Sequence, residues 1–241
     1  MRDIDRTKIS TFEKCVFCES HHETFGNTPE FKRLIGDKTN DRILFETKNF
    51  VVVPSVGQIV EGYLLIMPKK HYISISNLDY ELFDELEAVY SETRDILEKN
   101  YSKPIFFEHG VCRAEYYFNG CCVDHAHIHA VPAPVNVSES LKNEFRYTKI
   151  EKVSDLGQIA RDKNYLFVDD FSRNMYAYEA NEVRSQHIRY LIADLLGVPE
   201  KGDWTLYPGE KEMIATINKL SYWRKQKLRD EMLIVSKHGE M

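Results

Sequence analysis

Three histidines alternate with small or apolar residues in the segment His125-Ala126-His127-Ile128-His129-Ala130-Val131. In a β-strand this alternation places His125, His127 and His129 on one face and the residues between them on the other, toward a core. Nine histidines spread at random over 241 residues would almost never give this spacing, which favours a functional origin. The segment therefore predicts a row of three imidazoles.

Two kinds of chemistry can use such a row. Neutral imidazoles from alternate strand positions can hold a catalytic zinc ion. Alternatively, an imidazole whose second nitrogen is bound to a carbonyl can attack a phosphorus atom and form a labile phosphoramidate, which water then hydrolyses. The residue types alone leave both uses open.

The histidine segment follows a pattern of short apolar strands and one long helix. Residues 79–100 place Leu82, Leu86, Val89 and Leu97 on one helical stripe, with Asp79 as the expected N-terminal cap. The expected strands of this half are residues 43–45, 50–53, 63–67, 105–108 and 125–131. Strands packed on one side by helices predict an α+β architecture.

The chain after residue 148 shows a second, shorter series of elements. We expect strands at 165–168 and 175–178, a helix from Ser185 that Gly197 and Pro199 end, and a charged helix over 210–235. Trp204 and Trp223 are expected to pack within this part. The pattern predicts a smaller α+β extension with its own small core.

Composition sets broad limits on partners and location. The 38 acidic residues outnumber the 32 basic ones, giving a formal charge of −6, so we expect no nucleic-acid polymer as a partner. No segment approaches the roughly 18 consecutive apolar residues of a membrane span, and the first residues show no signal core. We therefore expect a cytoplasmic protein without membrane partners. Five cysteines, an odd number, argue against structural disulfides.

The histidine segment, followed by Pro132, resembles the signature of the histidine triad (HIT) family, and the resemblance continues upstream. It includes residues 50–53, 62–71 and 107–110 and covers about residues 12–135. The resemblance implies an α+β fold with an antiparallel sheet packed by helices, usually a homodimer, acting on nucleoside phosphates. It also implies a nucleotide-binding catalytic domain over residues 1–147, with residues 148–241 as an extension of unknown role. Longer members of the family have a pattern that resembles Gln186, His187 and Arg189, but these residues do not define a role.

The resemblance assigns unequal parts to the triad. The middle histidine, His127, would attack the α-phosphorus, and His129 would contact the phosphate or protonate the leaving group. A histidine at position 129 favours hydrolysis over transfer between sugars and nucleotides. By the same resemblance, the nucleotide-binding positions are Ser55, Glu108, Cys121, Cys122 and His129, and all of these except His129 depart from the family's usual residue types. Ser55 replaces an acidic or amide ribose contact, Glu108 a glutamine, and the cysteine pair a phosphate-binding Gln-Ser or Gln-Thr.

A C-x-x-C turn, Cys15-Val16-Phe17-Cys18, is the second feature with chemical potential. Two thiolates can converge on one ion, and tetrahedral zinc then needs two further ligands. Reduced, partly buried cysteines are the alternative, a disulfide is also open, and the competing ligands are His21, His22 and His109. The resemblance implies that His71 and His125 complete a structural zinc site, which would take His125 out of the chemistry.

The leading hypothesis is a hydrolase that cleaves a nucleoside 5′-phosphoryl bond, of a dinucleoside polyphosphate or nucleoside phosphoramidate, through a covalent nucleotidyl intermediate on His127. Two alternatives stay open within the resemblance, a nucleotidyltransferase and a non-catalytic nucleotide-binding or interaction protein. A zinc hydrolase with the metal on all three histidines is a third reading.

Overall fold

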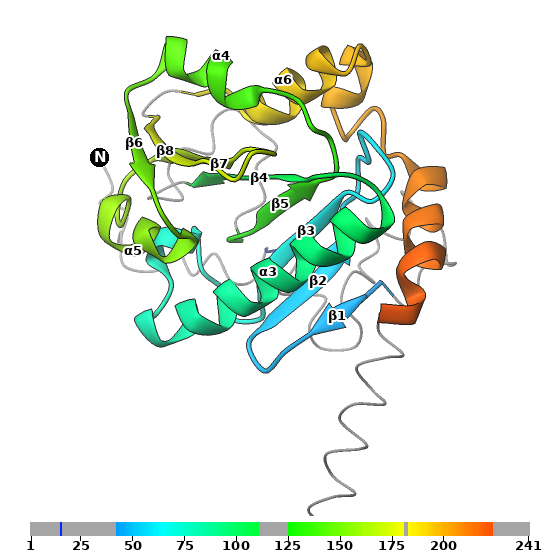
Figure 1. Cartoon of the computed structure of the whole chain (residues 1–241), viewed down its shortest axis with the longest axis horizontal. Coiled ribbons are helices and arrows are strands. Elements are labelled where there is room, and N and C mark those ends of the chain that lie inside the picture. Colours follow the sequence, from blue (N-terminus) through cyan, green and yellow to red (C-terminus); the bar gives the residue numbers. More distant parts are fainter. Residues whose placement is uncertain (1–14, 16–41, 111–124, 181–182, 224–241) are drawn as a thin grey trace, which may run out of the picture.

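The computed structural model describes residues 15, 42–110, 125–180 and 183–223. Its centre is one eight-stranded sheet with the strand order β1-β2-β3-β5-β4-β7-β8-β6, in which every neighbouring pair is antiparallel. Helices pack against this sheet (Figure 1). The α+β fold predicted from the sequence is confirmed.

Strands β2 and β3 are apolar along their whole length because both faces of the sheet are covered. All residues of β2 and β3 are buried, and the two strands pair from Phe50 opposite Pro68 to Pro54 opposite Leu64. The strands are β1 (Phe45–Glu46), β2 (Phe50–Pro54), β3 (Leu64–Pro68), β4 (Ile105–Gly110), β5 (Ile128–Val131), β6 (Tyr147–Ile150), β7 (Tyr165–Asp169) and β8 (Met175–Glu179).

Helix α3 (Phe83–Asn100) covers one face of the sheet. Its Leu86, Val89 and Leu97 are buried in the same apolar cluster as Phe106 and Ile128. The predicted stripe is correct, but the predicted cap is wrong. A short 3₁₀ turn, η5 (Tyr80–Leu82), precedes the helix, and Asp79 makes no capping hydrogen bond. Its carboxylate instead accepts hydrogen bonds from Tyr72 and Lys70.

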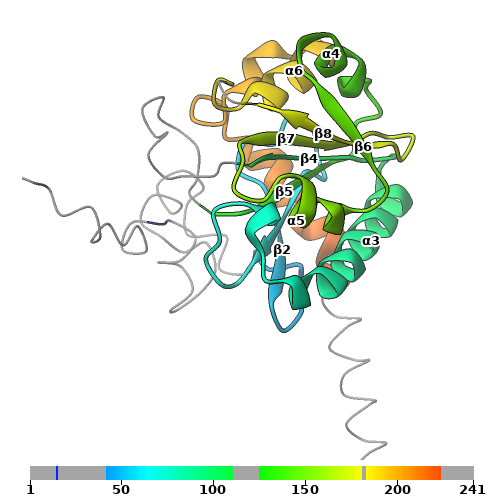
Figure 2. The same ribbon diagram turned by 90° about the vertical axis from the view of Figure 1, so that its left-hand side faces the viewer.

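Helices α4 (Val137–Glu144) and α6 (His187–Leu195) cover the opposite face, as Figure 2 shows above strands β4, β7 and β8. Ile188 and Ile192 of α6 share a buried cluster with Phe107 and Val131 of the sheet. As expected, α6 ends before Gly197, whose φ of 73° permits the turn that closes the helix. The remaining short helices are α5 (Leu156–Ile159), η4 (Ile75–Asn77), η7 (Val153–Asp155) and η8 (Pro199–Gly202).

The chain after residue 148 does not have a core of its own, contrary to the sequence-based expectation. Strand β7 pairs directly with β4, so residues 165–179 extend the same sheet. A helix over residues 210–223 returns to the other end of the sheet, where Trp223 stacks on Phe45 with ring centroids 4.8 Å apart. Trp223 Nε1 also donates to Glu92 in α3 at 3.0 Å, so it does not pack within the extension.

The division of the chain into a catalytic part over residues 1–147 and an extension over 148–241 stays a prediction. Within the described ranges, none of the helices has the length and apolar character that crossing a bilayer requires.

Candidate active site

The histidine segment enters the sheet later than predicted. Strand β5 begins at Ile128, so His125 and His127 precede the ladder that the sequence pattern extended to residue 125. The Ala126 amide donates a hydrogen bond to the Tyr72 carbonyl at 2.6 Å instead of pairing with a neighbouring strand. The alternation itself is confirmed, because Ala126, Ile128 and Ala130 are buried in the cluster under α3.

His127 is held by the backbone of its own segment. Its Nδ1 lies 2.6 Å from the carbonyl oxygen of His125. Because a carbonyl only accepts hydrogen bonds, Nδ1 must carry the proton, and in a neutral ring Nε2 carries the lone pair. Burial lowers the pKa of His127, the hydrogen bond to His125 opposes this shift, and the charge of Arg189 adds to it. The neutral, nucleophilic form is therefore favoured.

His129 lies between two aromatic side chains beside His127. Its ring stacks on Phe107 with centroids 4.3 Å apart and an interplanar angle of 11°, and its Nδ1 lies 2.7 Å from the hydroxyl of Tyr63. The ring centroids of His127 and His129 are 4.6 Å apart. Burial, and then the charges of His127 and Arg189, place the pKa of His129 well below its usual value. His129 is therefore also neutral near pH 7.

The structure adds His109 to this cluster, although the sequence indicated it only as a competing zinc ligand. Burial, followed by the charges of His187 and His127, lowers the pKa of His109 to about 4. Its Nδ1 is buried and has no hydrogen-bond partner in the described part of the chain. Because β4 pairs with β5 and Phe107 lies opposite His129, the residue two positions after Phe107 falls on the same face.

Arg189 of α6 is the second residue whose role the sequence did not define. Its side chain is 4% exposed, and its Nη2 and Nε donate to the carbonyls of Gly57 at 2.7 Å and Gly202 at 3.2 Å. Its guanidinium carbon lies 5.2 Å from the ring centroid of Tyr63. A cation from the last third of the chain therefore lies next to the triad.

Ser55 follows β2 and is buried. Its hydroxyl donates to the carbonyl of Val56 at 2.8 Å. Cys121, Cys122 and Cys18 lie outside the described residues.

Glu108 is not brought to the triad. It alternates with Phe107 along β4 and lies on the α3 side of the sheet, whereas His129 stacks on Phe107 on the other side. Its carboxyl group accepts hydrogen bonds from the Ile75 amide at 2.8 Å and from the hydroxyl of Tyr165. Burial raises the pKa of Glu108 to about 8, against the opposing effect of both hydrogen bonds. The neutral carboxyl group therefore belongs to the core, and we leave it out of the site.

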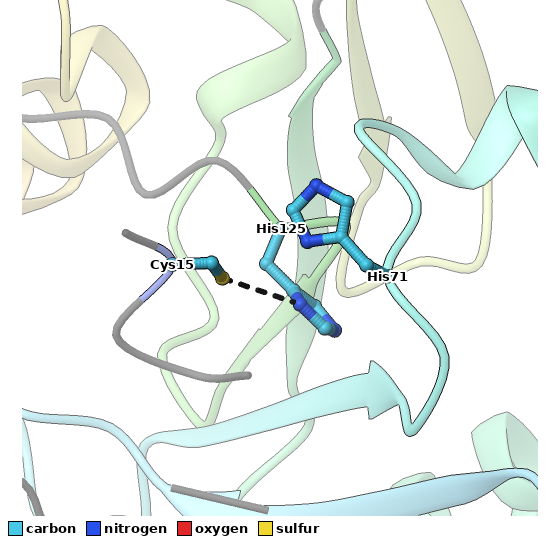
Figure 3. A group of neighbouring side chains, drawn as sticks. All are labelled: Cys15, His71 and His125. Atoms are coloured by element: carbon cyan, nitrogen blue, oxygen red, sulfur yellow. Dashed lines mark hydrogen bonds between the residues drawn. The ribbon is translucent and has the colours of Figure 1, made fainter. Parts of the chain in front are cut away.

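Three of the four predicted zinc ligands can be located, and they converge. One ligand atom from each of Cys15, His71 and His125 lies within 4.8 Å of the others. The Cys15 Sγ and His125 Nδ1 atoms are 3.6 Å apart, and the rings of His71 and His125 meet edge to face with centroids 5.3 Å apart. Figure 3 shows Cys15 approaching from one side and His71, from the loop after β3, from the other.

These residues fit a zinc ion in both spacing and protonation. Tetrahedral zinc holds sulfur at about 2.3 Å and imidazole nitrogen at about 2.0 Å, which separates the two atoms by roughly 3.5 Å. His125 Nε2 lies 2.7 Å from the Pro68 carbonyl, so Nε2 carries the proton and Nδ1 turns its lone pair toward Cys15. Burial lowers the pKa of His71, which favours the neutral form that a ligand requires.

Comparison with known proteins gives a family but little detail. A family model described as "Scavenger mRNA decapping enzyme C-term binding" matches residues 28–144, just under half of the 241-residue chain. A search among curated proteins found no match.

Solved structures with local similarity include a hypothetical protein from Leishmania major, with 17% identity over 52% of this chain and 76% of that chain and a TM-score of 0.36. A zinc-bound histidine triad family protein from Mycobacterium smegmatis matches with 21% identity over 50% and 76%, at a TM-score of 0.33. A HIT family hydrolase from Clostridium thermocellum matches with 19% identity over 50% and 91%, also at 0.33.

Because these TM-scores lie below 0.5, we draw no conclusion about this chain from the individual structures. Together, the family model over residues 28–144 and the triad segment support a protein of the histidine triad family.

Proposed function

We propose that this protein is a nucleotide hydrolase of the histidine triad type, with His127 as its nucleophile. The observation that carries the proposal is the 2.6 Å contact between His127 Nδ1 and the His125 carbonyl, which directs the lone pair of a neutral imidazole to Nε2. Substrates would be nucleoside 5′-phosphoryl compounds, either dinucleoside polyphosphates or nucleoside phosphoramidates. The decapping enzyme in the matched family's description supports the dinucleoside type.

The proposed reaction has two steps. His127 Nε2 bonds to the α-phosphorus while the bond from phosphorus to the leaving group breaks. The neutral His129 contacts the phosphate as a hydrogen-bond partner, and the leaving group takes up a proton from solvent. Water then attacks the same phosphorus and releases a proton to solvent, the nitrogen–phosphorus bond breaks, and the nucleoside monophosphate leaves. Transfer to an acceptor other than water would make the protein a nucleotidyltransferase, which stays the alternative.

Nucleotide contacts in this proposal come from His129, Ser55 and the segment containing Cys121 and Cys122. In this proposal zinc has a structural role. Its ligands would be Cys15, Cys18, His71 and His125, and the bound ion would anchor the segment that carries the nucleophile. A homodimer and a cytoplasmic location, both expected from the sequence analysis, stay part of the proposal. Light scattering of the full chain measures the oligomeric state.

The proposal is tested by replacing the nucleophile. We expect His127→Ala to abolish cleavage of a dinucleoside triphosphate and of a nucleoside 5′-phosphoramidate, with a loss of several orders of magnitude in kcat and an unchanged circular dichroism spectrum. His187→Ala is the matched control, since it removes an imidazole at the edge of the cluster. Full activity of His127→Ala would refute the proposal, and tight nucleotide binding without turnover by the unmodified protein would favour a binding protein.

A further inference from the structure

The helix over residues 210–223 contacts the loop that joins β2 to β3, and this loop ends beside the triad. We propose that Thr216 is a positioning residue of the site: it fixes the loop of residues 55–63 and, through that loop, holds the Tyr63 hydroxyl beside His129. The effect on the loop is independent of the proposed function, whereas the effect on turnover rests on it. The part of the chain after residue 148 would then take part in forming the site.

The loop of residues 55–63 is closed at its base by its own hydrogen bonds. The Ser55 amide donates to the Tyr63 carbonyl at 3.0 Å, and the buried side chain of Gln58 spans the loop. Gln58 Nε2 donates to the carbonyls of Ser55 and Tyr63 at 2.9 Å and 2.6 Å, and Gln58 Oε1 accepts from the Tyr63 amide at 3.2 Å. A displacement of Gln58 would therefore move Tyr63.

Thr216 connects this loop to the helix over residues 210–223. Its side chain is fully buried, and its Oγ1 accepts a hydrogen bond from the Gly62 amide at 2.8 Å. The hydroxyl proton is shared between the Glu212 carbonyl one turn earlier, at 2.8 Å, and Gln58 Oε1, at 3.2 Å. One hydroxyl group therefore contacts both the residue before Tyr63 and the side chain that holds Tyr63.

Other residues of the C-terminal part fix the beginning of the loop. The Gly57 amide donates to the Pro208 carbonyl at 2.7 Å, and the Gly57 carbonyl accepts from Arg189 Nη2 at 2.7 Å. Gly57 has a φ of 75°, and a Cβ atom there would lie 2.2 Å from Trp204 Cβ, so this close approach requires glycine. The loop is therefore held at two points by residues that follow position 148.

Tyr63 connects the position of the loop to the triad. Its side chain is fully buried, and its Oη lies 2.7 Å from His129 Nδ1. The stacking on Phe107, at 4.3 Å between centroids, fixes the plane of the His129 ring, and the Tyr63 hydroxyl fixes the rotation of the ring within that plane. In the proposed reaction His129 contacts the phosphate, so a small displacement of Tyr63 should lower the rate.

The contact with the loop can be tested without substrate. Thr216→Val keeps the shape of the side chain and removes the acceptor of the Gly62 amide. We expect this amide, followed by NMR in the full-length protein, to exchange with deuterium about tenfold faster in Thr216→Val and at the original rate in Thr216→Ser. An unchanged exchange rate in folded Thr216→Val would overturn the inference.

Thr93→Val is the matched control for the loss of a buried hydroxyl group. Thr93 is as buried as Thr216, and its hydroxyl donates in the same way to a carbonyl one turn earlier, that of Val89 at 2.7 Å. Among the described residues this is the only hydrogen bond of the Thr93 hydroxyl, and it lies within α3. Thr93→Val should therefore leave the exchange rate of the Gly62 amide unchanged.

Kinetics test the step from the loop to His129. Thr216→Val should lower kcat for a dinucleoside triphosphate about tenfold and leave KM within about twofold, because the change displaces a phosphate contact without removing one. We expect Thr216→Ser and Thr93→Val to keep kcat within about twofold. Equal losses in Thr216→Val and Thr93→Val would indicate a general loss of packing and overturn the positioning role.

Tyr63→Phe tests whether Thr216 acts through the tyrosine hydroxyl, and it also covers the case in which Thr216→Val does not fold. It removes only the hydroxyl, and we expect kcat to fall about tenfold. The double variant should be no slower than Tyr63→Phe alone, because both changes act on one shared contact. Additive losses, or an unchanged kcat in Tyr63→Phe, would contradict the inference. No turnover in the unmodified protein would refute the proposed function, and the exchange rate of the Gly62 amide would still decide the contact with the loop.

Discussion

The carbonyl oxygen of His125 accepts a hydrogen bond from Nδ1 of His127, 2.6 Å away, while the side chain of the same His125 faces Cys15 and His71. One residue therefore serves both centres: its imidazole is a candidate zinc ligand and its backbone orients the candidate nucleophile. The Nε2 atom of His125 is also fixed by the Pro68 carbonyl, at the end of β3. A change at the candidate zinc site should consequently reach the candidate nucleophile, His127, through this residue.

Removing zinc should affect stability first and chemistry second. We expect about one zinc ion per chain, and expect chelation or Cys15→Ser to lower the melting temperature by more than the roughly 2–4 °C that 1 kcal/mol produces at this size. Thermal melts with and without chelator, followed by zinc re-addition, measure this. Loss of turnover with an unchanged melting temperature would instead indicate a catalytic zinc, and the absence of zinc from purified protein would remove the site.

Glu108 should make stability depend on pH. Burial raises its pKa in the folded protein to about 8, above the usual value of 4.5, so the unfolded chain releases this proton at lower pH than the folded one. The contribution to stability is complete below pH 4.5 and is lost as the pH rises toward 8, by at most about 1 kcal/mol per pH unit. We expect Glu108→Gln to reduce this loss in urea unfolding.

Glu81→Gln is the control for that measurement, because Glu81 is an exposed carboxylate on the same side of the sheet. Its unfolding free energy should follow the unmodified protein at every pH. If Glu108→Gln keeps the full loss of stability between pH 5 and pH 8, then Glu108 is not the neutral core group described above.

Local sequence patterns predicted the elements that carry the site. The period of two around His127 and the apolar runs of β2 and β3 depend only on neighbouring residues. The structure confirms the alternation around His127 and the apolar strands β2 and β3. The helical stripe that became α3 was equally readable. The first residue of α3 could not be predicted in the same way, because the Asp79 carboxylate accepts hydrogen bonds from Lys70 and Tyr72 and does not cap the helix.

The other features of the candidate site depend on contacts between segments that are far apart in the sequence. Which face Glu108 and His109 occupy is fixed only once Phe107 lies opposite His129, and β4 contributes to both cores. Arg189 reaches the triad because α6 packs against the loop containing Gly57, 132 positions earlier in the chain. No local pattern contains that contact.

The ion pair between Arg94 and Asp169 should be important for stability. Both side chains are buried, and Asp169 also accepts a hydrogen bond from Tyr90 at 2.6 Å. We expect Asp169→Ala to cost about 3–5 kcal/mol in unfolding free energy, since it leaves the Arg94 cation buried without its partner. The pair of Arg173 and Glu98, of which Arg173 is exposed and Glu98 only half-buried, is the control, and Glu98→Ala should cost less than about 1 kcal/mol. Similar costs for the two variants would contradict this role.

Ser55 should contribute modestly to substrate binding. Its hydroxyl already donates to the Val56 carbonyl, so it can offer a nucleotide only an acceptor. We expect Ser55→Ala to raise KM up to about tenfold, in line with the roughly 1 kcal/mol of one hydrogen bond, and to leave kcat unchanged. Steady-state kinetics test this, and a loss of kcat comparable to that of His127→Ala would assign Ser55 to the chemistry.

The most direct test of the account is to trap the covalent intermediate. The full-length protein is mixed with a dinucleoside triphosphate, quenched within one turnover under conditions that preserve phosphoramidates, and analysed by intact-mass and peptide mass spectrometry. We predict one added nucleoside monophosphate per chain, located on His127 and absent from His127→Ala. An adduct on another residue, or turnover of this substrate without any adduct, would contradict the proposed mechanism.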